Sequence, residues 1–159
     1  MRVNFRDGFY AGLLVALIVG VYLARLWQPE RQIELHNAHL LSQIEKKNWA
    51  TVAEFVADDY QDRWGNDRAL LLEGLREVFR ALPNVRIEPA DPVMRTENSS
   101  GYWTAKITIR ATGEFAAMIE ARVNSLPAPF ELEWPHRSAK PWDWKLVCVR
   151  NPELEISGL

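Results

Sequence analysis

The residues best suited to catalysis by their type and spacing are three carboxylates around one phenol, at positions 58–62. Asp58, Asp59 and Asp62 flank Tyr60 in the sequence. A carboxylate beside a phenol at the mouth of a pocket can act as a general base with an oxyanion donor, as a small-molecule isomerase, lyase or hydrolase requires. Acidic residues at a helix end, directly before a Gly-Asn break, are more typical of a solvated turn. The sequence favours the turn and leaves Asp59 or Asp62, with Tyr60, as the catalytic alternative.

The sequence predicts no metal site and no cofactor. The acidic cluster lacks the alternating carboxylates and central glycine of an EF-hand loop. His36 and His39 are three residues apart and His136 lies in a polar turn, but no third ligand follows at a spacing typical of zinc. Cys148 is the only cysteine, so the chain can form neither an internal disulfide nor a thiolate zinc cluster.

Tryptophan offers a second kind of site, because the chain contains seven of these residues. Indole rings give large contact areas with few rotatable bonds. We therefore expect Trp64, Trp103, Trp134 and Trp144 to line a pocket for a small apolar ligand or a partner's side chain. Core packing is the alternative for the three that lie on the apolar phase of expected strands, whereas Trp64 lies in a polar loop and is the best single candidate for a surface contact.

Composition limits the chain to one compact domain and excludes some partners. Of its 159 residues, 48% are hydrophobic and 25% are charged, so the chain is neither disordered nor collagen-like. Lys and Arg number 19 against 21 Asp and Glu, for a formal net charge of -2. Without a basic surplus, the chain lacks the usual electrostatic footprint of a nucleic-acid-binding protein. We expect no nucleic-acid partner.

An uncharged apolar run, residues 8–24, lies near the start of the chain. Extended to residue 27, the run has the length that a helix needs to cross a bilayer. A cleaved signal peptide has a similar start, but the bulky Tyr22 two residues before Ala24 disfavours a small-x-small cleavage site. A buried core helix is the third alternative, although a run without a polar face is hard to wrap within a small domain. The sequence predicts an uncleaved single-pass transmembrane helix within residues 1–28.

The orientation of this anchor depends on the basic residues on its two sides. Arg2 and Arg6 precede the apolar run and Arg25 and Arg31 follow it, so the counts are nearly equal. A short basic leader directly before an apolar run is the ordinary pattern of a signal anchor. We expect the amino terminus in the cytoplasm and the domain outside the cell membrane.

Three helical segments and then several strands follow the anchor. Apolar residues recur at helical spacing over residues 29–44, 49–56 and 71–82, with Asn48 and Asn66 as the expected caps of the second and third helices. Beyond residue 83 the apolar period changes to two, which indicates strands. The expected strands are residues 85–87, 103–109, 115–123, 130–134 and 142–148. Helices gathered before strands with short turns predict an α+β fold, with helices covering one face of an antiparallel sheet.

Two segments resemble those of a known superfamily. Residues 45–60, EKKNWATVAEFVADDY, resemble the first helical region of the NTF2-like superfamily, which includes SnoaL-like and ketosteroid-isomerase-like domains. Residues 142–147, WDWKLV, resemble its last strand. The resemblance covers about residues 34–152 and implies a cone of strongly curved antiparallel sheet, whose mouth holds a small apolar ligand or is filled by side chains. We assign residues 29–159 to this domain.

The last strand also departs from the catalytic branches of the superfamily. Those branches often place a histidine after the last-strand tryptophan, and residues 147–150 contain none. A membrane anchor joined to such a domain also resembles the bitopic assembly proteins of type IV secretion machines, in which the domain binds other proteins. The expected function is a membrane-anchored, non-catalytic binding or assembly module. A protein partner, a homodimer and a small apolar ligand all remain open.

Overall fold

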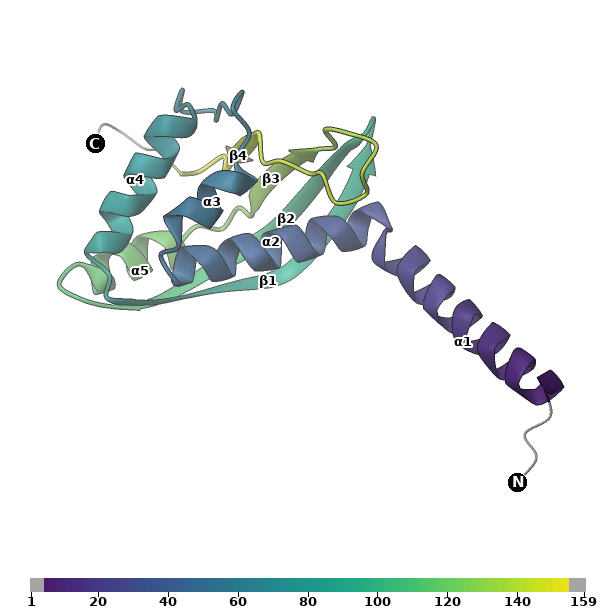
Figure 1. Ribbon diagram of the computed structural model, residues 1–159. Helices are drawn as coiled ribbons and strands as arrows, with labels where there is room; N and C mark the ends of the chain where they lie inside the picture. The colour runs from purple at the N-terminus through teal and green to yellow at the C-terminus, as the bar shows by residue number, and fades with distance from the viewer. Residues whose placement is uncertain (1–4, 155–159) are drawn as a thin grey trace.

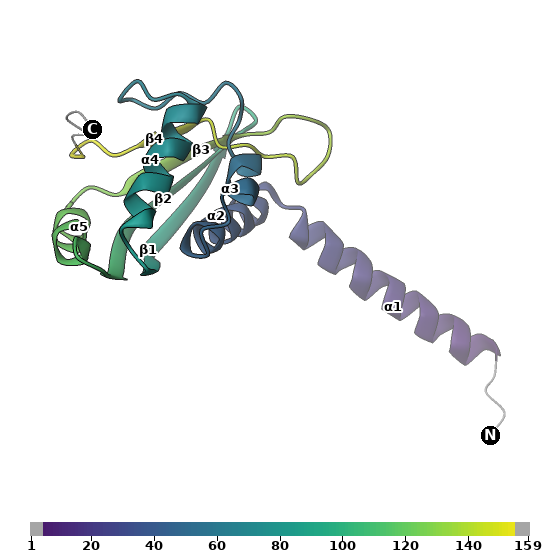
Figure 2. The same cartoon turned by 60° about the vertical axis from the view of Figure 1, so that its left-hand side comes forward.

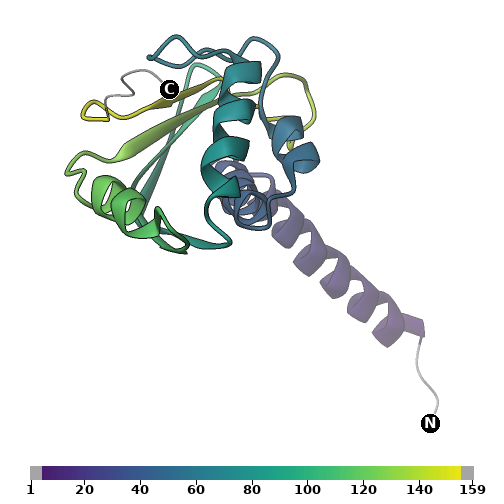
Figure 3. The same cartoon turned by 90° about the vertical axis from the view of Figure 1, so that its left-hand side faces the viewer.

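The computed structural model describes residues 5–154, without the side chains of residues 5–9 and 11. Arg2 and the Arg6 side chain, which enter the predicted orientation, lie outside this description. The chain order is four helices, a long hairpin, a short helix and two further strands. Figures 1 and 3 show helices α2, α3 and α4 on one side of a curved sheet.

Helix α1, Phe5–Leu26, extends away from the rest of the molecule (Figures 1 and 2). Helix α2, Pro29–Glu45, starts after a bend, with Pro29 at the first helical turn where its missing N–H is not needed. The buried Gln32 side chain donates from Nε2 to the carbonyl oxygen of Leu26, 2.7 Å away, and so ties α2 to the end of α1.

Within the described residues, no single helix meets the length and apolar composition of a membrane span. Residues Gly12–Leu26 and Pro29–Glu45 meet these criteria only as a pair, bent by 69°. The transmembrane helix therefore stays a prediction.

The amphipathic stripe predicted over residues 29–44 is confirmed. Ile33, Leu40 and Ile44 are buried against the sheet and α3, Trp49–Phe55. Asn48 occupies the N-cap position of α3, but its side chain donates to Gln43 Oε1 and makes no capping bond.

Helix α4, Arg68–Arg80, has its cap one residue after the predicted cap, Asn66. Asp67 is its cap, since the carboxylate accepts a hydrogen bond of 2.9 Å from the N–H of Leu70. The prediction that Asn66 caps this helix is wrong, because the Asn66 side chain instead donates to Asp62 Oδ2.

The sheet has four antiparallel strands in sequence order, as the α+β prediction requires. They are β1, Asn84–Glu97; β2, Ser100–Thr112; β3, Phe130–Pro135; and β4, Cys148–Arg150. The register of β1 against β2 shifts between Ala90 and Val93, and Asp91 at this irregularity has a positive φ of 49°. Such a bulge bends the strand locally.

Two strand predictions need correction. Residues 115–123, expected as a strand, fall almost entirely in helix α5, Ala116–Asn124. The last strand, expected from residue 142, is regular only from Cys148, while Trp144 and Leu146 form isolated bridges. Helix α5 lies along the part of β2 that β3 leaves unpaired, where the Asn124 side chain bonds both the N–H and the C=O of Ile109.

The core forms where α2 crosses the hairpin. Ile33 is fully buried, and a Cβ added to Gly101 of β2 would collide with its side chain. Glycine at this point lets the helix approach the strand closely. Trp103 and Trp134, 3% and 0% exposed, fill the same core, so tryptophan occupies much of the interior of the curved sheet.

Candidate functional site

Two of the three clustered carboxylates face solvent. Asp59 forms an ion pair of 2.6 Å with Arg137 and its side chain is 66% exposed. The Asp58 side chain is fully exposed and lies 3.8 Å from Arg68 Nε. A general base gains from a water-excluded position, which neither residue has.

Asp62 is buried, and its carboxylate accepts hydrogen bonds from within its own turn, residues 62–66. Its Oδ1 accepts hydrogen bonds from the N–H groups of Trp64 and Asn66, each at 2.9 Å, and its Oδ2 accepts from Asn66 Nδ2. The sequence favoured a solvated turn; a turn is present, but the carboxylate at its centre is buried. The oxygens that a general base would offer to a substrate are already occupied.

Tyr60 is buried within the core, at 2% exposed, and in the described residues its hydroxyl has no hydrogen-bond partner. Burial raises the pKa of this phenol well above its ordinary value, and the charge of Asp62 adds to the shift. Tyr60 therefore stays protonated, and it does not border the hollows described below.

The four predicted pocket tryptophans do not converge on one cavity. Trp103 and Trp134 lie in the core, as their core-packing alternative expected. Trp144 is also buried, and its Nε1 donates to the carbonyl oxygen of Pro141 at 2.8 Å. Trp64 is half-buried and its Nε1 donates to the carbonyl oxygen of Leu154 at 2.7 Å, which holds the carboxy-terminal segment against the turn.

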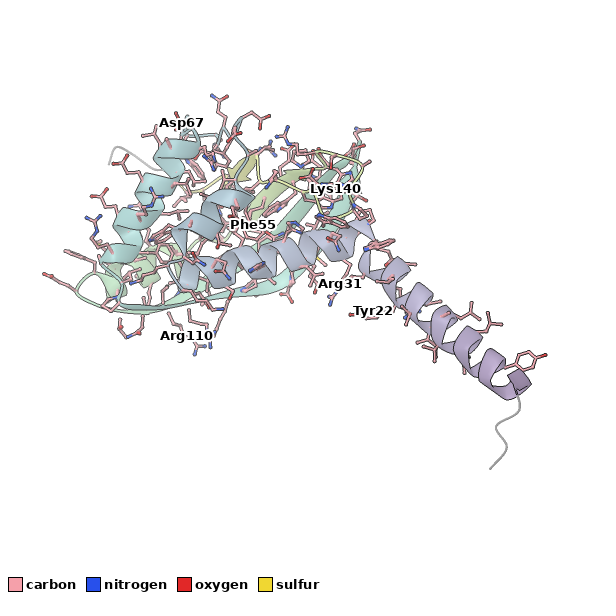
Figure 4. All side chains as sticks on the ribbon, in the orientation of Figure 1. Tyr22, Arg31, Phe55, Asp67, Arg110 and Lys140 are labelled. Atoms are coloured by element: carbon pink, nitrogen blue, oxygen red, sulfur yellow. The ribbon has the colours of Figure 1, made fainter. Side chains whose placement is uncertain are left out.

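A hollow of about 370 Å³ opens between α2, α3 and the β3–β4 loop, residues 136–147. The lining combines aromatic rings and charged groups. They are His36, His39, Thr51, Glu54, Phe55, Lys140, Trp142, Asp143, Trp144 and Lys145. Figure 4 shows Phe55 on α3 and Lys140 on the loop that faces it.

His36 joins the two walls of this hollow. Its Nδ1 lies 2.8 Å from the carbonyl oxygen of Gln32, and its Nε2 lies 3.1 Å from that of Trp142. Its ring packs edge-on against Phe55 and Trp134. Burial lowers the pKa of His36 below 6.5, although both carbonyl contacts act in the opposite direction.

A second hollow of about 450 Å³ shares Glu54 and Lys145 with the first, and Asp58 and Asp59 are among the residues that line it. Between the two, cations cap the carboxyl end of α3. Lys145 Nζ donates to the carbonyl oxygen of Glu54 at 2.6 Å, and Arg68 donates to those of Ala53 and Val56. Positive charge at a helix carboxyl end is stabilising.

No spacing in the sequence predicts these two hollows, although two of the predicted site residues border them, Trp144 the first and Asp59 the second. Lys145 lies 91 residues from Glu54 in the chain, so no short sequence motif contains both residues. In the sequence, the charged residues on both sides of Trp142 are the signal that points to this loop. Among the described residues, no group of three His, Cys, Asp or Glu side chains is arranged to hold a metal ion.

Comparison with known proteins identifies the fold only. No family model matches the chain, and no curated protein matches its sequence. A protein of the NTF2-like family from Streptomyces avermitilis, provisionally named a dehydratase, superimposes with a TM-score of 0.58 at 12% identity, covering 76% of this chain and 93% of that one. A cystatin-like protein of unknown function from Nostoc punctiforme gives a TM-score of 0.54 at 12% identity, covering 79% and 93%.

Bd1075 from Bdellovibrio bacteriovorus gives a TM-score of 0.56 at 7% identity, covering 76% of this chain. The chain matches 39% of the length of Bd1075. Because the identities are low, these likenesses establish the architecture and nothing about activity. The chain has an NTF2-like α+β fold.

Proposed function

We propose that the chain is a membrane-anchored NTF2-like domain that acts as a non-catalytic binding or assembly module. The observation that carries the proposal is the exposure of α1. Leu14, Val15, Leu17 and Ile18 are each about 60% exposed, although all are apolar. Water-exposed apolar surface on this scale marks a contact with another apolar phase.

The composition of α1 supports a bilayer as that phase. Residues 8–24, which make up most of this helix, carry no charged side chain. Arg25 lies in the last turn, where its long side chain can reach the headgroups. We further propose that α1 crosses the cell membrane once, with the amino terminus in the cytoplasm and the domain outside.

Membrane insertion is tested by fractionating cells that express the full chain and washing the membranes with alkaline carbonate. We expect the wild type to stay in the membrane and Ile18→Arg to be released, because a central Arg disfavours insertion by about 2.5–3.5 kcal/mol. Leu70→Arg, on the exposed surface of α4, is the matched control and should stay in the membrane. Wild-type protein in the soluble fraction would refute the anchor, and protease protection of the domain in intact cells would reverse the proposed orientation.

The binding role rests on the hollow between α2, α3 and the β3–β4 loop. Its rim offers exposed polar groups, His39 and Glu54, beside the aromatic ring of Phe55. Such a mixed, open lining suits the side chains of a protein partner better than a small apolar ligand, which needs an enclosed pocket. A second copy of the chain is one partner of this kind.

This role is tested by crosslinking in intact membranes from a photoreactive group at position 39. We expect a discrete crosslinked protein, identified by mass spectrometry, that is lost in Glu54→Lys and kept in Glu73→Lys. Glu73 is an exposed glutamate of α4 and serves as the control. Equal crosslinking in both variants would refute the hollow as the contact surface.

The catalytic alternative keeps Asp59 or Asp62 as the base. Two observations favour it: Asp59 borders the second hollow, and some neighbouring structures carry enzyme names, such as the provisional dehydratase. It predicts that Asp59→Asn or Asp62→Asn abolishes turnover of a small-molecule substrate while the domain remains folded. Turnover that either substitution abolishes would replace the binding module with an enzyme.

A further inference from the structure

Three segments meet at the end of the domain from which α1 leaves. In the first turn of α2, Glu30 accepts a hydrogen bond of 2.8 Å from Thr96 Oγ1, near the tip of the β1–β2 hairpin. The tip is joined to the β3–β4 loop, since the N–H of His136 donates to the carbonyl oxygen of Ser99 at 2.9 Å. Figures 1 and 4 show this end, with Arg31 and Lys140 near the bend and Asp67 at the opposite end.

The bend fixes how high this end stands above a membrane that α1 crosses. With α1 along the membrane normal, a bend of 69° leaves α2 inclined by about 21° to the membrane plane. From Pro29 to His36 the helix advances about 10 Å, so it rises by only about 4 Å. The headgroup layer is about 5–8 Å thick on each side of the hydrocarbon core. With Pro29 placed at the edge of the hydrocarbon core, the contact between His36 and the Trp142 carbonyl lies at headgroup depth.

The chemistry of the β3–β4 loop fits this depth. Trp142 is 57% exposed, whereas Trp134, before the loop, and Trp144, within it, are buried. Exposed tryptophan favours the membrane–water interface, where the ring contacts the apolar phase and the N–H faces the hydrated headgroups. The loop also carries three cations, of which Arg137 pairs with Asp59 and Lys145 caps α3, so that Lys140 is the one offered to the headgroups.

We propose that the β3–β4 loop lies in the headgroup layer of the membrane, with Trp142 inserted at the interface and Lys140 facing anionic lipid headgroups. The inference rests on the proposed insertion of α1 and adds a second contact with the same bilayer. This contact holds the domain against the membrane surface, so that its opposite end, with α5, points away from the lipid.

The test uses the full chain in vesicles of phosphatidylcholine and phosphatidylglycerol, with a nitrobenzoxadiazole label on one introduced cysteine. Buried Cys148 is first replaced by alanine. Leu17→Cys reports α1, Trp142→Cys reports the loop, and Met118→Cys on α5 is the exposed control. Quenching is measured with nitroxides attached either to the lipid headgroup or deep in the acyl chain.

We expect headgroup nitroxides to quench position 142 roughly twofold or more above position 118, and acyl-chain nitroxides to quench position 17. Lys140→Glu should lower quenching at 142 and leave position 17 unchanged, because it repels anionic headgroups. Quenching at 17 with equal values at 142 and 118 would overturn the loop contact while the anchor stands. Loss of quenching at 17 would overturn the anchor, and the loop proposal with it.

Discussion

Helices α1 and α2 are neighbours in the chain, yet they use isoleucine in opposite ways. Ile18 of α1 is 61% exposed, and Ile33 of α2 is fully buried. Ile33 packs closely against β2, because Gly101 has no side chain at the point where the helix approaches the strand. The glycines of α1 make no such close contact, since a Cβ added to Gly12 or Gly20 would meet no atom within 4 Å.

The contrast teaches that apolar composition alone does not decide burial. Helix α2 has one apolar stripe and polar residues elsewhere, and the stripe lies against the sheet. Helix α1 is apolar on every side, so a sheet could cover only part of it. The same substitution can therefore be made at a buried and at an exposed position. The difference in the free energy of unfolding then shows which position belongs to the packed domain.

The largest difference is expected between Ile33→Ala and Ile18→Ala. Removing the buried side chain leaves a cavity at the α2–sheet contact and should lower the free energy of unfolding by about 2–5 kcal/mol. Removing the exposed one should change it by less than about 0.5 kcal/mol. The measurement is denaturant unfolding of the full chain in mild detergent. Equal losses for the two variants would show that α1 packs as part of the domain.

A second pair tests the same contact from the strand. Gly101→Ala should destabilise by about 1–3 kcal/mol, because the new Cβ collides with Ile33. Gly74→Ala on α4 is the control, since a Cβ there meets nothing within 4 Å and alanine favours the helix by about 0.5–1 kcal/mol. In the double variant Gly101→Ala, Ile33→Ala the two losses should not add. Full additivity would refute the direct collision.

The parts of the fold that sequence could predict are those with a clear period. The helical stripe over residues 29–44 has one buried face and occurs as predicted. The alternation over residues 115–123 is also compatible with a helix, and the choice was made by contacts distant in sequence. Glu120 and Asn124 satisfy backbone groups of β2, at Ala111 and Ile109, that a further strand would have paired.

The candidate site was predictable only where its contacts are local. Asp62 bonds groups two and four residues ahead, so its turn could be recognised in the sequence. The hollow beside α3 depends on the β3–β4 loop crossing α2, and His36 lies 106 residues from Trp142. No spacing within one element encodes such a contact.

The pair Asp62 and Asp59 extends the comparison to charged groups. Asp62→Ala should lower the free energy of unfolding by about 1–2 kcal/mol, because it leaves the part-buried N–H donors of Trp64 and Asn66 without their acceptor. Asp59→Ala removes an ion pair whose carboxylate is 66% exposed, and should cost less than about 0.5 kcal/mol. Thermal unfolding by circular dichroism measures both. A larger loss from Asp59→Ala would mean that its pair with Arg137 organises the loop.

The smallest effect is expected from a pair of histidines on α2. Burial lowers the pKa of His36 below 6.5, so the unfolded chain takes up this proton more readily than the folded one. The contribution of His36 to stability is therefore constant above pH 6.5 and decreases as the pH falls below that value. The carbonyl oxygens of Gln32 and Trp142 both favour the imidazolium form and so act against the effect of burial.

The free energy of unfolding, measured from about pH 7.5 to about pH 5.5, should fall less in His36→Gln than in the wild type. His39→Gln removes an exposed histidine from the same helix and controls for the loss of the residue type. If the curves of His36→Gln and the wild type run parallel, His36 titrates alike in the folded and unfolded chains. The wall between α2 and the β3–β4 loop would then be as open to water as the surface that carries His39.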